Sequence, residues 1–422
     1  MGMVRRFGAV FLGGVLFAFL AGCERKAAEG PTPANSAAPS TNGRTLLASP
    51  EGAEASEPAI AAGADGRVFV AYVQKSGEAA DLFVRAYDAA KGTLGDAVRV
   101  NPVAGQVKTW YGDPPTIAVG PSGAVHIGWT AKYPDGAKGT ILYMSVSRDG
   151  GATFGAPVQV NDDTEPVSHG MHSMAVANDG KVYFSWLDER YLKNKSTVAT
   201  PTPQNGHGNA GPHPEEAEVE PNAELYYASS ADGKTFGHNR KIAADVCPCC
   251  KSSTVVSDKG RAAIGYRKVF DGGFRHIAVT SLNDFGDAWS EPMQVSDDGW
   301  RIDACPVSGP ALRFDGDALE VAWVSGADAG QKGVYVSRWT DPSGRAFEPR
   351  KLVAETEAGG SPSWAGERLL WSAVGKIGMW NKGGTSMQAD GRNVVAAAAN
   401  GRTFYAFVST EGEHKAVRLH FE

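Results

Sequence analysis

The segment SRDGGATF at residues 147–154 decides the fold of this chain. It lies between two runs of strand-forming residues, ILYMSV at residues 141–146 and PVQV at residues 157–160. Two such runs joined by a glycine-containing turn predict a β-hairpin. The side chains of Ser147 and Asp149 can hydrogen-bond to the turn backbone, and the glycines tolerate positive φ angles. The segment therefore predicts a tight turn between antiparallel strands that its own side chains stabilise.

Degenerate copies of this turn recur along the chain, at residues 229–236 (SSADGKTF), 281–289 (SLNDFGDAW) and 341–347 (DPSGRAF). Similar turns at regular spacing are typical of repeat folds. The set follows the pattern S-x-D-x-G-x-T-W/F and resembles the Asp-box (BNR repeat) turn of sialidase-type β-propellers. The resemblance implies that each turn joins the third and fourth strands of a blade and has a structural role, on the face opposite the ligand site.

A unit of short strands and glycine-containing turns recurs between residues 58 and 422, which predicts an all-β, seven-bladed β-propeller. Residues 45–48 can supply the missing fourth strand of the last unit, so that the N-terminal strand closes the ring and few sheet edges stay exposed. Six blades is the alternative if the two short C-terminal units merge, and a β-sandwich is the architecture that the repeated turn argues against. The predicted units occupy residues 59–100, 116–160, 174–243, 254–295, 311–353, 362–380 and 393–421.

Composition and charge narrow the class of partner. The chain has 422 residues, a net charge of −6 and 21% charged residues, which is ordinary for a globular protein. No basic cluster exists beyond Arg5 and Arg6, so we expect no nucleic-acid partner. The 52 glycines suit a protein that contains many tight turns.

The N-terminus has the features of a secretion signal. Two arginines precede the apolar residues 7–20, a run too short to span a membrane. The sequence LAGC at residues 20–23 resembles the bacterial lipobox, which implies a lipoprotein signal peptide at residues 1–22 and lipidation of Cys23. A signal peptide cleaved at a small-residue site and a short anchor helix are the alternatives.

Residues 23–57 follow as a lipidated cysteine and a disordered tether rich in Ala, Pro, Ser and Gly. Glu24 would occupy the second mature position, and a residue other than Asp there resembles the pattern of lipoproteins that are sorted to the outer membrane. No second long apolar run is present, so we expect the propeller at residues 58–422 to be a soluble, lipid-anchored monomer on the periplasmic face of the outer membrane.

One face of the predicted propeller collects the residues that carry chemistry, because loops entering the first strands share that face with loops between second and third strands. A long insertion at residues 191–222 interrupts the third unit there, and such a loop is either a lid or a disordered segment. The residues expected on this face are Glu57, Asp113, His169, His172, Arg190, Cys247, Cys249, Cys250, Tyr266, Arg267, Arg275, Trp300, Arg301 and Cys305.

The sialidase resemblance implies a glycosidase site on this face. Sialidases hold the substrate carboxylate with three arginines and cleave with a tyrosine nucleophile and an aspartic acid, and guanidinium groups suit a planar carboxylate. The sequence departs from the family at residues 57–59, where Glu-Pro-Ala replaces Arg-Ile-Pro. The residues assigned to catalysis are Asp113, Arg190, Tyr266, Arg267 and Arg275, and those assigned to ligand binding are Glu57, Trp300 and Arg301.

The cysteines offer a different chemistry. Removing Cys23 leaves an even number, and disulfides are the default in an oxidising compartment, so we expect a Cys247–Cys305 disulfide between adjacent blades. The alternative is a copper or zinc site, since imidazole and thiolate bind both metals. Its ligands are drawn from His169, His172, Cys249 and Cys250. Thiol–disulfide exchange is a third alternative.

These observations predict a cell-envelope lipoprotein that binds a glycan or another acidic ligand at the central mouth, with exo-α-sialidase-type hydrolysis as the implied activity. Two alternatives stay open, because propellers host many unrelated functions. One is a copper- or zinc-binding or thiol-redox protein, and the other is a binding scaffold without catalysis.

Overall fold

The computed structural model describes residues 43–190, 222–283, 288–302, 306–327, 330–340, 346–357 and 359–422. The predicted signal peptide, Cys23, most of the insertion at residues 191–222, and Cys305 lie outside the described residues. Within them the chain is nearly all β, with antiparallel sheets and one single-turn 3-10 helix, η2 (Asp271–Gly273). No helix in this part of the chain is long and apolar enough to cross a membrane. The predicted all-β class is confirmed.

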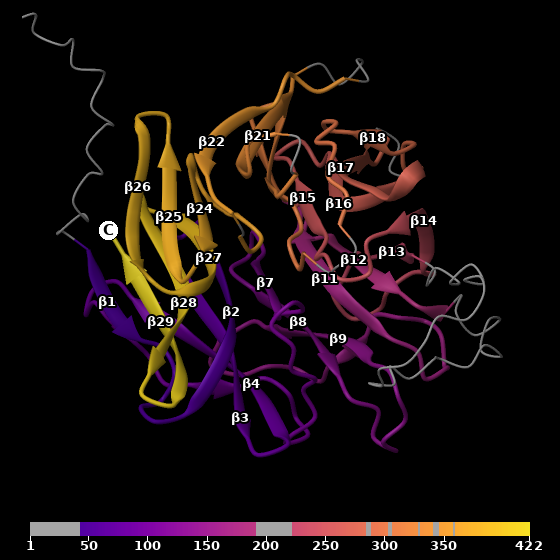
Figure 1. Cartoon of the computed structure of the whole chain (residues 1–422). Helices are drawn as coiled ribbons and strands as arrows, with labels where there is room; N and C mark the ends of the chain where they lie inside the picture. Colours follow the sequence, from indigo (N-terminus) through magenta and orange to yellow (C-terminus); the bar gives the residue numbers. More distant parts are fainter. Residues whose placement is uncertain are drawn as a thin grey trace, which may run out of the picture. The chain divides into compact units, whose positions relative to one another are not determined.

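The strands form successive antiparallel units, and the chain passes through each unit from one strand to its neighbour (Figure 1). The first unit comprises β2 (Glu54–Ala62), β3 (Val68–Ser76) and β4 (Ala79–Asp88), with the short β5 (Thr93–Leu94) and β6 (Val98–Arg99) both paired to β4. The second comprises β7 (Thr116–Val119), β8 (Val125–Ala131), β9 (Ile141–Ser147) and β10 (Val158–Gln159). The third comprises β11 (His169–Val176), β12 (Val182–Asp188), β13 (Ala223–Ser230) and β14 (Arg240–Val246).

The remaining units continue the pattern to the C-terminus. The fourth comprises β15 (Ser253–Val256), β16 (Ala262–Phe270), β17 (Phe274–Ser281) and β18 (Met293–Gln294), and the fifth β19 (Ala311–Asp315), β20 (Ala318–Ser325), β21 (Gly333–Trp339) and β22 (Lys351–Glu355). The sixth comprises β23 (Ser363–Ala365), β24 (Arg368–Ala373), β25 (Lys376–Asn381) and β26 (Gly384–Asp390). The last comprises β27 (Arg392–Ala399), β28 (Arg402–Glu411), β29 (His414–Phe421) and the N-terminal β1 (Arg44–Leu47).

The two ends of the chain meet in the last unit. β1 pairs antiparallel with β29, with Arg44 opposite Phe421 and Leu47 opposite Arg418, and Figure 1 shows the indigo strand beside the yellow ones. The N-terminal strand therefore supplies the fourth strand of this unit, one residue earlier than the predicted residues 45–48.

The hydrophobic core is divided into seven clusters in the described residues, each shared by two units that follow one another. Val279 of the fourth unit packs with Trp323 of the fifth, for example, and Tyr72 of the first unit shares a cluster with Phe404 of the last. The first strands β2, β7, β11, β15, β19, β23 and β27 also contact one another in this order, and β27 contacts β2. Every unit thus packs against the units before and after it.

The second strands carry the largest fully buried side chains of this core. Trp129 in β8, Trp186 in β12, Tyr266 in β16 and Trp323 in β20 are all fully buried. Large aromatic side chains bury the most apolar surface per residue, so they dominate the packing between units.

The third and fourth units are joined by strand pairing, whereas the sequence predicts a separate sheet for each unit. β16 runs to Phe270, whereas the short β15 pairs only with its first residues, Ala262 to Gly265. The far end of β16 is therefore free to pair with β14, where Val246 lies opposite Lys268. The third and fourth units consequently form one eight-stranded sheet.

The segment at residues 147–154 forms the predicted turn. Ser147 Oγ donates to Asp149 Oδ1 over 2.7 Å and accepts the backbone N–H of Gly151 over 2.8 Å. Asp149 also accepts the backbone N–H of Thr153 over 2.9 Å and its hydroxyl over 2.5 Å. Gly150 and Gly151 have φ angles of 78° and 87°, which L side chains rarely adopt.

A second copy of the turn, at residues 230–236, has corresponding hydrogen bonds and is one residue shorter. Ser230 Oγ contacts Asp232 Oδ1 over 3.1 Å and accepts the N–H of Gly233, and Asp232 accepts the N–H of Thr235. The copies at residues 281–289 and 341–347 run partly outside the described residues.

Two boundaries differ from the sequence prediction. The sixth unit has a fourth strand, β26, that was not predicted, because its sequence GTSMQAD is mostly exposed and lacks an apolar pattern. Ordered structure also begins before residue 58, since β1 and the start of β2 occupy part of the predicted tether.

Substitution Ser147→Ala should weaken the turn. It removes a buried hydroxyl that donates one hydrogen bond and accepts another, so the free energy of unfolding should fall by about 1–2 kcal/mol. Urea unfolding of the two proteins measures this difference. Ser122→Ala, at an exposed turn residue, is the control and should change stability by less than about 0.5 kcal/mol. Equal stability of the Ser147 variant and the wild type would contradict the role of the turn.

Candidate functional site

A central cavity of about 600 Å³ is lined by residues from the first strand of every unit. The seven strands contribute Glu57 and Pro58, Thr116, Ser173, Thr254, Leu312, Trp364 and Val394, and the loops before them add Tyr111 and Lys251. The volume lies in the range of about 300–1,000 Å³ that is typical of small-molecule sites. The cavity therefore brings together segments that are far apart in the sequence.

The strands around this cavity carry strained backbone at its rim. Glu57, Met171 and Asn393 have φ angles of 57°, 53° and 54°, and each lies at a register shift within β2, β11 or β27. Val307, shortly before β19, has a φ of 46°. Positive φ costs free energy for a residue with a side chain, and bulges of this kind re-aim side chains next to functional sites. Repetition of the feature in four units marks this rim as the candidate site.

Glu57 is the one carboxyl group among the described residues that line the cavity. Its side chain is only 2% exposed, its Oε1 accepts the hydroxyl of Thr109, and its Oε2 has no hydrogen-bond partner among the described residues. Burial raises the pKa of Glu57 to about 7, the Thr109 hydrogen bond offsets part of this effect, and the charge of Asp113 adds to it. A carboxyl group with this pKa can donate or accept a proton near neutral pH.

The pKa of Asp113 is shifted in the opposite direction, because its carboxylate has several hydrogen-bond donors and positive charges around it. His172 Nδ1 lies 2.9 Å from its Oδ1, and Thr130 donates to its Oδ2 over 3.0 Å. Burial is the largest influence on the pKa of Asp113 and by itself raises it. The charge and hydrogen bond of His172, the charge of Lys251 and the Thr130 hydrogen bond together outweigh burial, so the pKa lies below its usual value. The His172 ring stacks on Phe184 and directs Nε2 at the carbonyl of Gly128. At neutral pH Asp113 is therefore ionised, whereas the Glu57 carboxyl is present in both its protonated and its ionised form.

Lys251 brings the only amine among the described residues that line the cavity. Its Nζ donates to the carbonyl of Pro114 over 3.2 Å. Burial lowers the pKa of Lys251 to about 8, against the opposing charge of Asp113. The backbone of Lys251 approaches that of Gly309 closely, since a Cβ added at Gly309 would lie 1.8 Å from the carbonyl oxygen of Lys251.

The arginines of the predicted sialidase-type site do not form one carboxylate-binding group. Arg190 contacts Asp188 through Nε and Nη2, each over 2.9 Å, and Asp162 through Nη1. Its guanidinium also covers the ring of Tyr226. Arg190 is therefore the centre of its own ion-pair network at the end of β12.

Arg267 and Arg275 have different partners again. Arg267 is fully buried and donates to the backbone carbonyls of Ser308, Val324 and Arg275. Arg275 Nη1 lies 3.0 Å from the sulfur of Cys247. No carboxylate contacts Arg267 among the described residues, so this guanidinium fastens backbone segments together.

The other predicted ligand and nucleophile residues lie in the core or on loops. Tyr266 occupies the core position equivalent to Trp129 and Trp186, and burial raises the pKa of its hydroxyl. Trp300 is 8% exposed and stacks on the guanidinium of Arg267, and Arg301 covers the ring of Phe274. Neither Tyr266 nor Trp300 lines the cavity.

The predicted metal ligands are not brought together either. His169 Nδ1 faces the carbonyl of Thr140 over 2.6 Å, and its Nε2 lies 2.9 Å from Asp163, while His172 is held by Asp113. The one group of described residues with the spacing of metal ligands is Cys247, Cys249 and Cys250. The mixed histidine–cysteine site is therefore not assembled.

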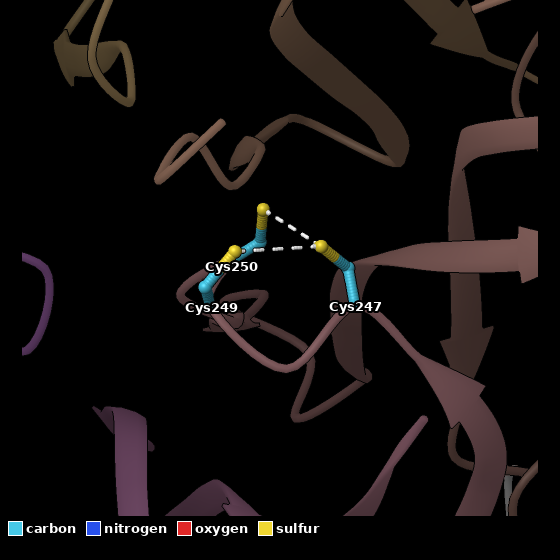
Figure 2. Close-up of side chains that lie close together, drawn as sticks. All are labelled: Cys247, Cys249 and Cys250. Carbon is cyan, nitrogen blue, oxygen red and sulfur yellow. Dashed lines mark hydrogen bonds between the residues drawn. The ribbon is translucent and has the colours of Figure 1, made fainter. Parts of the chain in front are cut away.

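The cysteine turn also corrects the predicted disulfide. Cys247 is a free thiol, so a Cys247–Cys305 disulfide is wrong, whereas Cys249 is disulfide-bonded. Cys250 is free as well, and the sulfurs of the three residues lie within 4.8 Å of one another (Figure 2). The sequence could not distinguish these cysteines, because the turn decides which sulfur faces which neighbour.

Two participants of the site were absent from the sequence prediction. Lys251 directly follows the cysteine turn and precedes a predicted strand, so its place at the rim could have been inferred. The role of Thr109 could not be inferred, because its contact with Glu57 joins the loop before β7 to strand β2 of another unit.

Comparison with known proteins agrees with the fold. No family model and no curated protein matches the sequence. Among solved structures, the chain is similar to a protein of unknown function from Dyadobacter fermentans, with a TM-score of 0.53 and 11% identity over 90% of this chain and 99% of that chain. It is also similar to a polysaccharide lyase, the PL25 ulvan lyase solved with -[GlcA(1-4)Rha3S]-, with a TM-score of 0.50 and 13% identity over 87% and 93%.

A sialidase also matches, Hadza microbial sialidase Hz136, with a TM-score of 0.46 and 12% identity over 83% of this chain and 75% of that chain. The similar structures are thus propeller-type folds of glycan-acting enzymes, together with one protein of unknown function. At these identities the similarity concerns the fold.

Gly309→Ala should disturb the cavity rim. The new methyl group would lie 1.8 Å from the carbonyl oxygen of Lys251, so the backbone must move and the free energy of unfolding should fall by about 1–3 kcal/mol. Thermal unfolding measures the loss. Gly360→Ala is the matched control, because it lines the same cavity and has no atom within 4 Å of the added methyl. Equal stability of the two variants would contradict the close approach.

The raised pKa of Glu57 predicts a pH dependence of stability. The protonated carboxyl is favoured in the folded protein, so its stabilising contribution is present at low pH and is lost as pH rises through about 7. Between pH 5 and pH 8 the wild type should lose on the order of 2–3 kcal/mol more than Glu57→Gln, whose amide does not titrate. Urea unfolding at both pH values tests this. Glu51→Gln, at an exposed residue, should behave as the wild type. Identical pH profiles of the Glu57 variant and the wild type would refute the shift.

Proposed function

We propose that this chain binds an acidic glycan in the central cavity and that Glu57 exchanges a proton with the bound saccharide. The observation that carries the proposal is the buried Glu57 carboxyl, with its free Oε2, its pKa of about 7 and its strained backbone at the cavity rim. Cleavage at a glycosidic bond requires such a proton donor or acceptor, and its efficiency is greatest when its pKa lies near the working pH.

The surroundings of Glu57 support an acid paired with an ionised carboxylate. Environments that push the pKa values of two carboxyl groups apart are typical of acid–base sites. Here the pKa of Glu57 is raised and that of Asp113 is lowered, and the charge of Asp113 contributes to the shift at Glu57. We assign Asp113 a positioning role, since its oxygens are held by Thr130 and His172.

Two features of the rim favour an acidic sugar polymer. Lys251 brings a positive charge that a carboxylate or sulfate group can meet. Tyr111 is 56% exposed beside Trp110, and exposed aromatic rings present an apolar face with a polar edge on which sugar rings stack. The similar ulvan lyase was solved with a glucuronate-containing saccharide, and this supports the same ligand class here.

The proposed function goes with a closed ring of blades, and it takes the place of the sialidase activity that the sequence implied. We infer a closed seven-bladed propeller from the seven inter-unit clusters, the cyclic contacts of the first strands and the pairing of β1 with β29. Exo-α-sialidase-type hydrolysis would need arginines directed at the substrate, and Arg190, Arg267 and Arg275 bind other groups instead. Proton transfer by Glu57 does not depend on them.

We further propose that the protein is lipidated at Cys23 and held on the periplasmic face of the outer membrane. The support is the LAGC sequence at residues 20–23 and Glu24 behind it. Mass spectrometry of the mature N-terminus and membrane fractionation of Cys23→Ala test this localisation.

The proposed function predicts cleavage or binding of uronate-containing polysaccharides. The full chain is incubated with a panel of uronate-containing, sulfated and neutral polysaccharides, and new reducing ends are measured together with binding by calorimetry. Glu57→Gln should lower the cleavage rate about 100-fold or more and leave binding within a few-fold, because a proton-transfer group contributes mainly to the chemical step.

Glu51→Gln serves as the matched control and should keep the wild-type rate. Lys251→Met should weaken binding of the acidic polymers more than that of neutral ones. Full activity of Glu57→Gln would reject the proton-transfer role of Glu57. Failure to bind any of the polymers would reject glycan binding in the cavity.

A further inference from the structure

The cysteine turn next to the cavity has features that glycan binding does not require. Cys247, Pro248, Cys249 and Cys250 form a β-turn in which the N–H of Cys250 bonds the carbonyl of Cys247 over 3.3 Å. Proline at the second position favours such a turn because its φ is already fixed. The turn places the thiol of Cys250 3.4 Å from the sulfur of Cys247 (Figure 2).

Positive charge surrounds the first of these sulfurs. Arg275 Nη1 lies 3.0 Å from Cys247 Sγ, and the buried guanidinium of Arg267 acts on both thiols. Arg267 has no carboxylate partner among the described residues, although it is fully buried. A buried cation needs a counter-charge, and the thiolate of Cys247 is the anion at hand.

The two thiols differ in acidity, and their geometry explains the difference. The hydrogen bond from the Cys250 thiol and the charge of Arg275 lower the pKa of Cys247 to about 6, against its burial. Burial raises the pKa of the Cys250 thiol, which acts as the donor. A stabilised thiolate next to a protonated thiol in a Cys-x-x-Cys spacing is the arrangement of a reactive thiol pair.

We propose that Cys247 and Cys250 are a redox-active dithiol that hydrogen peroxide or a similarly small hydroperoxide oxidises to an intrachain disulfide. The oxidant must be small, because Cys247 and Cys250 are fully buried. This inference is independent of the proposed function, since it uses none of the residues assigned to the saccharide.

The chemistry proceeds in two balanced steps. The Cys247 thiolate attacks one peroxide oxygen, so that an S–O bond forms, the O–O bond breaks and the leaving hydroxide takes up a proton to become water. The sulfur of Cys250 then attacks that of Cys247, so that the S–S bond forms and the S–O bond breaks. The hydroxide leaves with the Cys250 proton as a second water. Two thiols and one peroxide give one disulfide and two waters.

A metal site at the same sulfurs is disfavoured by the charges. Cys249 is disulfide-bonded, which leaves two thiols as ligands, and a cation there would lie beside the guanidiniums of Arg267 and Arg275. Like charges at short range in a buried site repel strongly.

The test uses the full chain as purified, without reductant. Before peroxide treatment, alkylation and peptide mapping should find Cys247 and Cys250 free, and afterwards the two should be joined in one disulfide. In Cys250→Ser the reaction should stop at a sulfenic acid on Cys247, which dimedone traps. Loss of the guanidinium in Arg275→Gln should slow oxidation about tenfold or more, and the control Arg301→Gln should not, because Arg301 contacts Phe274 instead.

Three results would overturn the proposal: unchanged thiols after peroxide, a Cys247–Cys249 disulfide formed by exchange with the existing bond, or stoichiometric copper or zinc on the purified protein. All three are measured on the wild type, so the test holds even if a variant misfolds. Saccharide binding is measured on the same samples. A failed oxidation with intact binding would reject the thiol pair alone, and a failed binding with intact oxidation would reject the glycan alone.

Discussion

Hydrophobic contact between successive units is the constraint on which the rest of this structure depends. A small antiparallel sheet with two apolar faces would expose both of them to water if it stood alone, which is unfavourable. Each unit buries these faces against the units before and after it, and the clusters that result include one between the first unit and the last. This packing fixes the first strands side by side and so creates one cavity from all of them.

The same packing explains which parts of the fold the sequence could predict. Turns such as residues 147–154 are local, because their hydrogen bonds join residues that are close in the chain, and the alternation of apolar runs gives nearly every strand. The strand that was missed, β26, is polar because it lies at the outer edge of its sheet. The pairing of β14 with β16 was not predictable from either unit alone, since it depends on how far β16 extends.

The candidate site was predicted less well, and the reason is again physical. A position at the end of a strand fixes the face of the sheet, but it does not fix the partner of a long side chain. Arg190 and Arg267 lie near the expected ends of their strands, yet one binds aspartates and the other binds backbone carbonyls. Tyr266 shows the same limit, because the aromatic residue expected to be a nucleophile is the core residue of its unit. Glu57 was recognised as a departure from the family pattern, but its acid–base character depends on burial, which the sequence does not give.

The cavity and the thiol pair are neighbours in the chain. Lys251 follows Cys250 directly, so one short segment places the thiols toward Arg267 and Arg275 and the amine in the cavity wall. The backbone of the turn is already closed by the hydrogen bond between Cys250 and Cys247, and a disulfide between them would need little movement. Its main effect would be to remove a negative charge beside two guanidiniums. A buried positive charge that loses its counter-ion acts over longer distances than a surface charge, because the protein interior screens it weakly. Oxidation would therefore leave the guanidiniums of Arg267 and Arg275 without this counter-charge.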